Sequence, residues 1–143
     1  EAGPGDPQGF LVLSQYRSGL GDREGALEAV ERHLDDLKIH EALAASMDLA
    51  RAANGYVDAR EPWSQAKDPT LAAELDETLA TLARSLTVLT ALFLPVTPEK
   101  MTELARRLGL ASVPTVEQAT SIPLAGRSVE VGSPLFPRPD PPA

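Results

Sequence analysis

Two histidines and an aspartate near the start of the chain are of residue types that bind metal ions. His33, Asp36 and His40 stand at positions i, i+3 and i+7, and one face of an unbroken helix would hold all three. A fourth ligand is not evident, however, and the spacing crosses a predicted helix end near Lys38. A solvated helix surface is the simpler interpretation, so we expect no metal site in this chain.

The acidic pairs and the serines lack the arrangements that catalysis requires. Asp35-Asp36 and Asp76-Glu77 are neighbours in the sequence, so the members of a pair cannot act as acid and base across a substrate. Exposed helix faces explain both pairs. The serines lie in no G-x-S-x-G turn, and the sequence has no glycine-rich phosphate loop. We therefore expect no catalytic residue and no bound cofactor, and a free-standing enzyme is the least favoured interpretation.

The single tryptophan is the residue best placed for molecular recognition. Trp63 directly follows Pro62, where a predicted helix must stop, and an indole can project into solvent from such a position. Two interpretations are open: the ring covers the end of the core, or it is a platform on which an unstacked RNA base stacks. Weaker candidates for RNA contacts lie around it: the cations Arg51, Arg60 and Lys67, and the base-edge partners Asn54 and Gln65.

The helices that must position these residues follow from the spacing of the apolar side chains. Apolar residues recur at three- and four-residue steps in four stretches, which predict helices over about 23–37, 39–60, 70–93 and 98–109. Asp22 can cap the first helix, and Pro62 ends the second. The third has the strongest pattern, a stripe of Leu71, Leu75, Leu79, Leu82, Leu86, Leu89 and Phe93. Short connections between such helices favour an antiparallel bundle of about four helices, so the predicted fold class is all-α.

The two ends of the chain differ in character from this helical domain, which we place at residues 22–112. Residues 1–21 hold five glycines and two prolines around a short apolar run, and are expected to be a linker or a displaced tail. Residues 113–143 contain seven prolines and are expected to form a strap that packs on the bundle. Within the strap we predict a helical turn near 116–119 and a small hairpin over 123–131 around Ala125-Gly126. Leu135 and Phe136 are expected to hold its extended end against the helices.

Length and composition restrict the chain to one domain without covalent cross-links. With 143 residues, 43% of them apolar, it can build a single core. No apolar run reaches the roughly 18 residues that a membrane helix needs, and no signal peptide begins the chain. Cysteine is absent, which excludes disulfides and thiolate metal sites. We expect a soluble, cytoplasmic domain with no membrane partner, and the first residue, Glu1, suggests a fragment or a processed product.

The net charge of −8 is distributed unevenly. Residues 22–61 carry ten acidic and five basic residues, whereas residues 96–143 carry five of each. Proteins bind the phosphates of nucleic acids largely through lysine and arginine. The first half of the chain should therefore repel phosphate, and any binding of RNA should be weak.

Three segments of the sequence, taken together, resemble methionyl-tRNA synthetases. The first consists of ANGYVD at 53–58, EPW at 61–63 and AK at 66–67, and is similar to a family pattern in which PW follows AN-x-Y. The second is LPVTP at 94–98, with the next helix ending at Leu108-Gly109, and the third is PLFPR at 134–138. The resemblance covers about residues 30–140.

The resemblance implies a fold and a role. In that family of class I synthetases, this region is a helix bundle behind the catalytic domain, and the tryptophan after the proline stacks on an anticodon base of methionine tRNA. It implies that Trp63 is the anticodon contact, while Asn54 and Tyr56 are mainly packing and hydrogen-bonding anchors. Charging of the tRNA, together with ATP and possibly zinc, would belong to the catalytic domain of the longer parent protein, and this chain alone would not be an enzyme.

The sequence also departs from the family. The first bundle helix of the family carries an anticodon-reading pattern like N-x-x-NR, which residues 1–21 do not contain. The ATP-binding signatures and the zinc cysteines are absent from this chain, and Pro139 stands where the family has a branched apolar residue. An alternative function therefore stays open, a synthetase-derived helical module that serves interaction or structure and binds no tRNA.

Overall fold

The computed structural model describes residues 23–138, and these residues form an all-α fold without a strand. The fold class predicted from the sequence is therefore confirmed. The four predicted helices are all present, joined by two shorter α-helices and a 3-10 helix. In chain order the elements are α2 (Arg23–Asp35), α3 (Ile39–Arg60), α4 (Pro62–Gln65), η1 (Pro69–Leu71), α5 (Ala72–Phe93), α6 (Pro98–Arg107) and α7 (Val116–Ser121). The predicted linker at 1–21 and the cap Asp22 lie outside the described residues.

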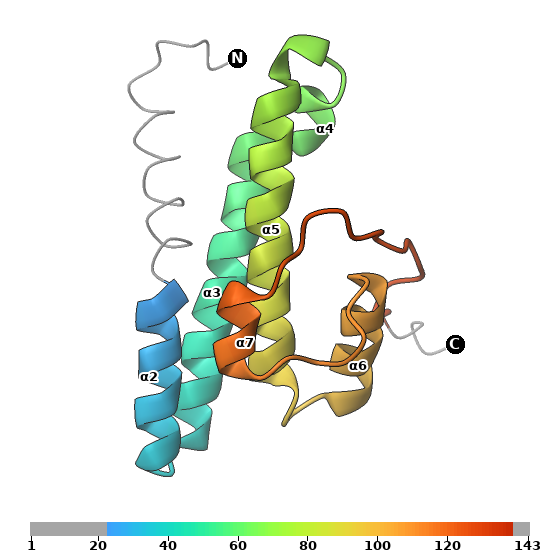
Figure 1. The fold of residues 1–143 in the computed structure, drawn as a ribbon. Coiled ribbons are helices and arrows are strands. Elements are labelled where there is room, and N and C mark those ends of the chain that lie inside the picture. Colours follow the sequence, from blue (N-terminus) through green and yellow to red (C-terminus); the bar gives the residue numbers. More distant parts are fainter. Residues whose placement is uncertain (1–22, 139–143) are drawn as a thin grey trace, which may run out of the picture.

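The two long helices α3 and α5 run antiparallel and form the axis of the molecule (Figure 1). α2 packs against α3 on one side of this pair, and α6 and α7 pack against α5. α4 closes one end of the pair, where α3 turns into α5, whereas the turn between α2 and α3 lies at the other end. The segment that contains Trp63 is therefore the tip of a long helical hairpin.

α2 ends two residues earlier than the apolar spacing predicts, because the chain reverses there into a left-handed cap. Leu37 has a φ of 58°. Its N–H donates to the Leu34 carbonyl at 2.9 Å, and the Lys38 N–H donates to the His33 carbonyl at 2.7 Å. These are the two bonds of a Schellman motif, which usually has glycine in the left-handed position. The motif separates α2 from α3, so His33 and His40 do not share one continuous helix face.

The buried face of α5 differs from the predicted leucine stripe. Leu79 and Leu86 are 50% and 37% exposed, and Leu82 is only partly buried against the core. The buried residues of α5 are instead Thr78, Ser85, Thr87, Val88, Leu89, Thr90, Ala91 and Leu92. Placing Leu86 in the core was therefore wrong.

Hydrogen bonds within α5 explain how hydroxyl side chains can occupy its core face. Thr78, Ser85, Thr87 and Thr90 each donate to the carbonyl four residues earlier, at distances of 2.6 to 2.9 Å. A buried hydroxyl with such a partner avoids the cost of an unsatisfied polar group. α3 also buries small side chains, Ala42, Ser46 and Ala53, beside Leu49 and Tyr56. Many buried positions of the two long helices are thus occupied by small or internally bonded residues, which a search for large apolar side chains does not detect.

A second cluster of apolar residues lies around α6 and the chain that follows it. Ala105, Leu108 and Leu110 are buried there, and Ile122 and Leu124 pack against them. α6 ends at Arg107, two residues before the predicted end. Gly109 follows with a φ of 71°, and a Cβ at this position would lie 2.9 Å from the Ser128 carbonyl oxygen. Glycine is therefore required there by both the backbone conformation and the close approach of the C-terminal segment.

The predicted helical turn at 116–119 is confirmed as α7, which begins with a capping box. The Thr115 hydroxyl accepts from the Gln118 N–H, and the Gln118 side-chain carbonyl accepts from the Thr115 N–H. Such reciprocal bonds satisfy two donors that a helix start otherwise leaves free. Arg84 of α5 donates to the Ala119 carbonyl at 3.1 Å and so attaches α7 to the bundle.

The hairpin predicted over 123–131 is wrong. Gly126 does turn the chain, with a φ of 74° and a bond from the Arg127 N–H to the Leu124 carbonyl, but no strand follows. The Glu130 N–H instead donates to the Arg107 carbonyl at 2.8 Å. Val129 and Val131, whose alternation predicts a strand, are 64% and 94% exposed. The segment 123–131 therefore bonds to the end of α6 and does not pair with itself as two strands.

The C-terminal strap lies along α6 and is held mainly by polar contacts (Figure 1). Arg107 donates to the Ser133 carbonyl at 2.6 Å, and Arg106 forms an ion pair with Glu130. Leu135 is partly buried, as expected, but Phe136 is 62% exposed. The expected anchoring by Phe136 is therefore wrong, since arginines on α6 take that role.

None of the helices formed by residues 23–138 is long and apolar enough to cross a membrane. The acidic pairs Asp35-Asp36 and Asp76-Glu77 are exposed, as predicted; all four residues lie on helices except Asp36, which is in the turn after α2.

Candidate nucleic-acid interface

The corner between α3 and α4 presents Trp63 through an unusual backbone conformation. Glu61 adopts φ 44° and ψ 60°, the left-handed region, and it both ends α3 and precedes α4. Its N–H donates to the Val57 carbonyl at 2.9 Å, while its carbonyl accepts from the Ser64 N–H at 2.8 Å. Pro62 occupies the first position of α4, where a missing N–H does no harm. The chain therefore changes direction within one residue, and Trp63 follows on a new helical turn.

The indole of Trp63 is half exposed, with 51% of the residue open to solvent. Among the large apolar residues of the described chain, it is one of the most exposed that a helix carries. The residue is thus not sealed inside the bundle. Exposed aromatic rings on a rigid support can stack unpaired bases of any sequence.

The opposite side of α4 anchors the corner to the rest of the bundle. Gln65, two residues after Trp63, is only 7% exposed, and its side-chain carbonyl oxygen has no hydrogen-bond partner among the described residues. Asp68 follows as the cap of η1 and accepts from the Thr70 N–H and hydroxyl at 2.9 and 2.7 Å. These two bonds lower the pKa of Asp68 and keep it a carboxylate. The connection to α5 is therefore short and well bonded.

Arg60 fastens the end of α3 directly to α5. Its Nε donates to the Thr78 hydroxyl at 3.0 Å, and its Nη2 donates to the Glu74 carbonyl at 3.3 Å. Thr78 is fully buried, and Arg60 itself is partly buried. The arginine thus holds the helical hairpin together just behind the Trp63 corner.

The six candidates for RNA contact therefore fall into two groups. Trp63, Asn54, Arg51 and Lys67 are exposed and accessible to a partner. Arg60 and Gln65 are turned into the structure, so a contact with RNA would require them to leave their present positions. The contacts made by Arg60 run to residues 14 and 18 positions away, which no local pattern in the sequence reveals.

The charge on the exposed face of α3 is largely neutralised within the protein. The Arg51 guanidinium lies 2.5 Å from Asp48, one turn earlier, and Asp58 lies one turn beyond Asn54. Lys67 is the exposed cation closest in sequence to Trp63. A surface with so few free cations offers little of the attraction to phosphate that dominates most nucleic-acid binding.

The hydroxyl stripe of α5 and the left-handed Glu61 are features of this region that the sequence patterns did not reveal. Pro62 does indicate a helix break, yet the residue before a proline usually adopts an extended conformation. The left-handed conformation of Glu61 lets α4 fold back onto α5, and the two helices are in contact.

The residues considered for a metal site do not assemble one. Within residues 23–138, no group of three histidine, cysteine, aspartate or glutamate side chains is placed to hold an ion. His33 lies 3.0 Å from Glu41, and His40 is largely exposed. The Schellman motif at Leu37 is the reason, because it ends α2, which carries His33, and His40 then belongs to a different helix, α3.

Comparisons with known proteins give one consistent result. The family model for the anticodon binding domain of methionyl tRNA ligase matches residues 14–139 of this chain. A methionine--tRNA ligase of Deinococcus radiodurans is 34% identical over 148 residues, which cover 92% of this chain and 22% of that protein. The methionine--tRNA ligase of Bacillus subtilis is 35% identical over 121 residues, covering 80% of this chain and 18% of the relative.

A solved structure shows the same fold. The crystal structure of the apo form of Mycobacterium tuberculosis methionyl-tRNA synthetase superimposes with a TM-score of 0.75 and 26% sequence identity. The similarity covers 99% of this chain and 28% of the other. The chain thus spans about a fifth to a quarter of the length of the relatives that it matches.

Proposed function

The chain belongs to the family of anticodon-binding domains of methionyl-tRNA ligases, and on that basis we propose that it recognises the anticodon loop of methionine tRNA through Trp63. The observation that supports this most directly is the half-exposed indole at the tip of the α3–α5 hairpin. Stacking on such a ring contributes about 1–3 kcal/mol per base. Asn54 and Lys67 are the accessible polar neighbours for further contacts.

Rigidity is what makes one aromatic ring useful in this role. Arg60 ties α3 to α5, buried Gln65 fixes α4, and the left-handed Glu61 sets the angle between α3 and α4. A ring held in this way loses little conformational freedom when a base stacks on it, so more of the contact energy appears as affinity.

The binding should nevertheless be weak. The exposed face beside Trp63 carries Asp48 and Asp58 together with Arg51, so few counterions would be released when RNA binds. In a longer ligase, a catalytic domain that grips the same tRNA elsewhere would make the anticodon contact intramolecular and so amplify it. We assign the charging reaction, with its ATP and any zinc, to such a catalytic domain and not to these residues, and we place the protein in the cytoplasm.

The test is a titration of the chain with an RNA hairpin that carries the methionine anticodon CAU, compared with the same hairpin carrying another anticodon. We expect weak binding of the first hairpin with a shallow salt dependence, strong quenching of the Trp63 fluorescence, and loss of binding in Trp63→Ala. Phe136→Ala is the matched control, because Phe136 is an aromatic residue at least as exposed as Trp63, at 62% against 51%, in a different part of the structure. Binding that survives in Trp63→Ala, or that fails equally in Phe136→Ala, would contradict the assignment.

A second function is favoured by the acidic first half of the chain. A domain with ten acidic and five basic residues over 22–61 could instead be a synthetase-derived module that binds or supports a protein. A folded chain that binds neither hairpin even at low salt would support this alternative.

A further inference from the structure

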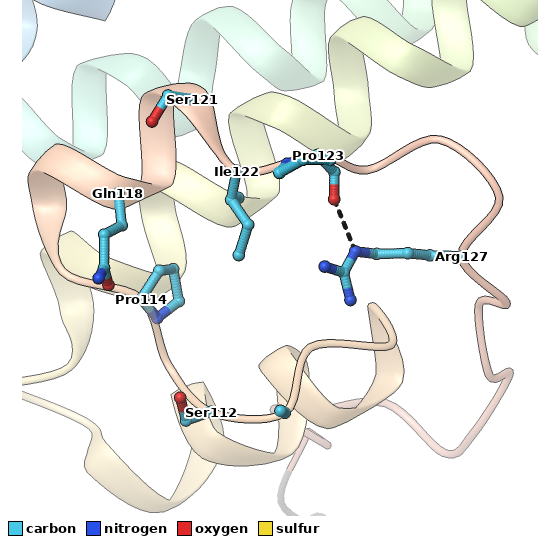
Figure 2. A pocket seen from close by; sticks show the side chains of 8 residues that line it. Ser112, Pro114, Gln118, Ser121, Ile122, Pro123 and Arg127 are labelled. Carbon is cyan, nitrogen blue, oxygen red and sulfur yellow. Dashed lines mark hydrogen bonds between the residues drawn. The ribbon is translucent and has the colours of Figure 1, made fainter.

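A hollow of about 430 Å³ lies between α7, the segment that leads into it, and the turn that follows it (Figure 2). Its wall includes the apolar Pro114 and Ile122 on one part and the polar Ser112, Gln118 and Ser121 on another. Arg127 is the only charged residue in the wall, and the wall contains no carboxylate. In a chain of net charge −8, this is a local site of positive charge.

The guanidinium of Arg127 is fixed so that part of it faces the hollow (Figure 2). Its Nε donates to the Pro123 carbonyl at 2.7 Å, and its Nη1 donates to the Gly109 carbonyl at 2.6 Å. Its Nη2 has no hydrogen-bond partner among residues 23–138. The side chain is thus held in one orientation while donors remain for a ligand.

Arg127 differs from three other arginines in the kind of partner that it has. Arg51, Arg106 and Arg107 each pair with a carboxylate of Asp48, Glu103 or Glu130. The partners of Arg127 are neutral carbonyl oxygens, so its positive charge is not compensated by an acid. A guanidinium of this kind suits the oxygens of a phosphate, which it can bind with two parallel N–H donors.

The remaining polar groups of the hollow complement an anion. The Gln118 carbonyl oxygen is occupied by the Thr115 N–H in the capping box, which leaves the amide N–H groups of Gln118 as donors. Ser112 and Ser121 also line the hollow, although the Ser121 hydroxyl is turned away from Arg127 (Figure 2). Behind the hollow, Arg84 covers the Ala119 carbonyl at the end of α7, so a carbonyl that would otherwise repel an anion is neutralised.

We infer that this hollow is a binding site for a phosphate group that pairs with the Arg127 guanidinium, with the neutral polar groups of Gln118 and Ser112 across the hollow from it (Figure 2). The phosphate could come from an RNA backbone or from a free phosphate compound. The site itself is independent of the proposed function, whereas an RNA source would rest on it. α7 lies beside the part of α5 that is remote from α4, so an RNA whose loop meets Trp63 would have to extend along α5 to reach the hollow (Figure 1).

The first test uses inorganic phosphate. The chain, labelled with ¹⁵N, is titrated with sodium phosphate at constant ionic strength, and the signals of the Arg127 Nε–H and the Gln118 side-chain amide are followed by NMR. We expect a saturable shift of both signals, and no such shift with chloride. An absence of saturable shifts with phosphate would overturn the proposal, and so would an equal response to acetate, which would assign the hollow to a carboxylate of a partner protein.

The discriminating variants are Ser121→Asp and Thr120→Asp. Both change the net charge by one unit in the last turn of α7, but only Ser121 lines the hollow, and Thr120 is exposed beside it. A carboxylate in the wall of the hollow should weaken phosphate binding at least about tenfold, whereas Thr120→Asp should change it by less than about threefold. Neither variant removes a bond of Arg127. Equal weakening by both variants would mean that phosphate responds only to the net charge of the protein and is not bound in the hollow, which would refute the proposal.

The second test identifies the source of the phosphate and separates this inference from the proposed function. With the CAU hairpin as ligand, an RNA source predicts that the Arg127 signal shifts and that Ser121→Asp weakens hairpin binding more than Thr120→Asp does. A hairpin that leaves Arg127 unaffected, while inorganic phosphate still shifts it, assigns the site to a free phosphate compound. Trp63→Ala should abolish hairpin binding and leave the response to inorganic phosphate unchanged, so failure of one proposal does not imply failure of the other.

Discussion

Replacing Thr78 by valine should destabilise the protein far more than the same replacement at Thr87. Both threonines lie on α5 with no exposed surface, and both donate to the carbonyl four residues earlier at 2.8 Å. Only Thr78 has a second partner, the Nε of Arg60, whose hydrogen bond to the hydroxyl measures 3.0 Å. Valine keeps the shape of threonine in each case, so the two variants differ in the fate of Arg60.

The magnitude follows from what each substitution leaves behind. In Thr87→Val the Ala83 carbonyl keeps its backbone partner in the helix, so no polar group is orphaned and the change in unfolding free energy should stay within about 0.5 kcal/mol. In Thr78→Val the partly buried Nε of Arg60 loses its acceptor. Leaving a buried donor unsatisfied costs about 1–3 kcal/mol, and the partial exposure of Arg60 places the expected cost near 1–2 kcal/mol.

Urea denaturation followed by circular dichroism at 222 nm measures both variants. A difference of about 1–2 kcal/mol should also appear as a fall in melting temperature of several degrees for Thr78→Val. Because Arg60 supports the Trp63 corner, the same variant should weaken binding of the CAU hairpin, while Thr87→Val should not. Equal stabilities of the two variants would refute the idea that the Arg60 bond fastens the hairpin.

Three further predictions follow from the fold. Leu49→Ala should lower the free energy of unfolding by about 2–5 kcal/mol, because Leu49 is 3% exposed. Leu86→Ala should lower it by less than about 1 kcal/mol, because Leu86 is 37% exposed. Equal losses of stability in thermal unfolding would contradict the packing of α5. Leu37→Gly should stabilise the protein by about 0.5–1 kcal/mol, because Leu37 has a φ of 58° and is 82% exposed. The control is Lys38→Gly, which should destabilise the protein because Lys38 has a negative φ. Hydrogen bonds from Arg106 and Arg107 lower the pKa of Glu103 from 4.5 to about 2. Because these two arginines hold the strap, its attachment should be complete above pH 4.5 and should weaken as the pH falls toward 2. The expected result is a fall in melting temperature that is smaller in Glu103→Gln.

Local signals in the sequence were sufficient for the four main helices. α3 has the predicted bounds because its apolar spacing, and the proline that stops it, act within a few residues. The same is true of Gly109 at the end of α6 and of the helical turn that became α7. The three family segments also lie at sequence positions that can be recognised one by one, and the family to which they point is the one that the comparisons show. An exposed place for Trp63 was one of two readings of its position after Pro62.

Contacts between distant residues decided the rest. From the sequence, Arg60 is a candidate cation for RNA, but in the structure its Nε donates to Thr78, 18 residues later. The predicted hairpin does not form, because Glu130 bonds instead to α6, some 24 residues earlier. The core face of α5 was misjudged because a buried threonine is acceptable only when its hydroxyl has an acceptor, which the helix itself supplies. Helix ends marked by proline or glycine and a capping box depend on near neighbours and can be recognised in the sequence, whereas the burial of a polar side chain depends on which group satisfies it in the folded chain, and that becomes known only when the chain has folded.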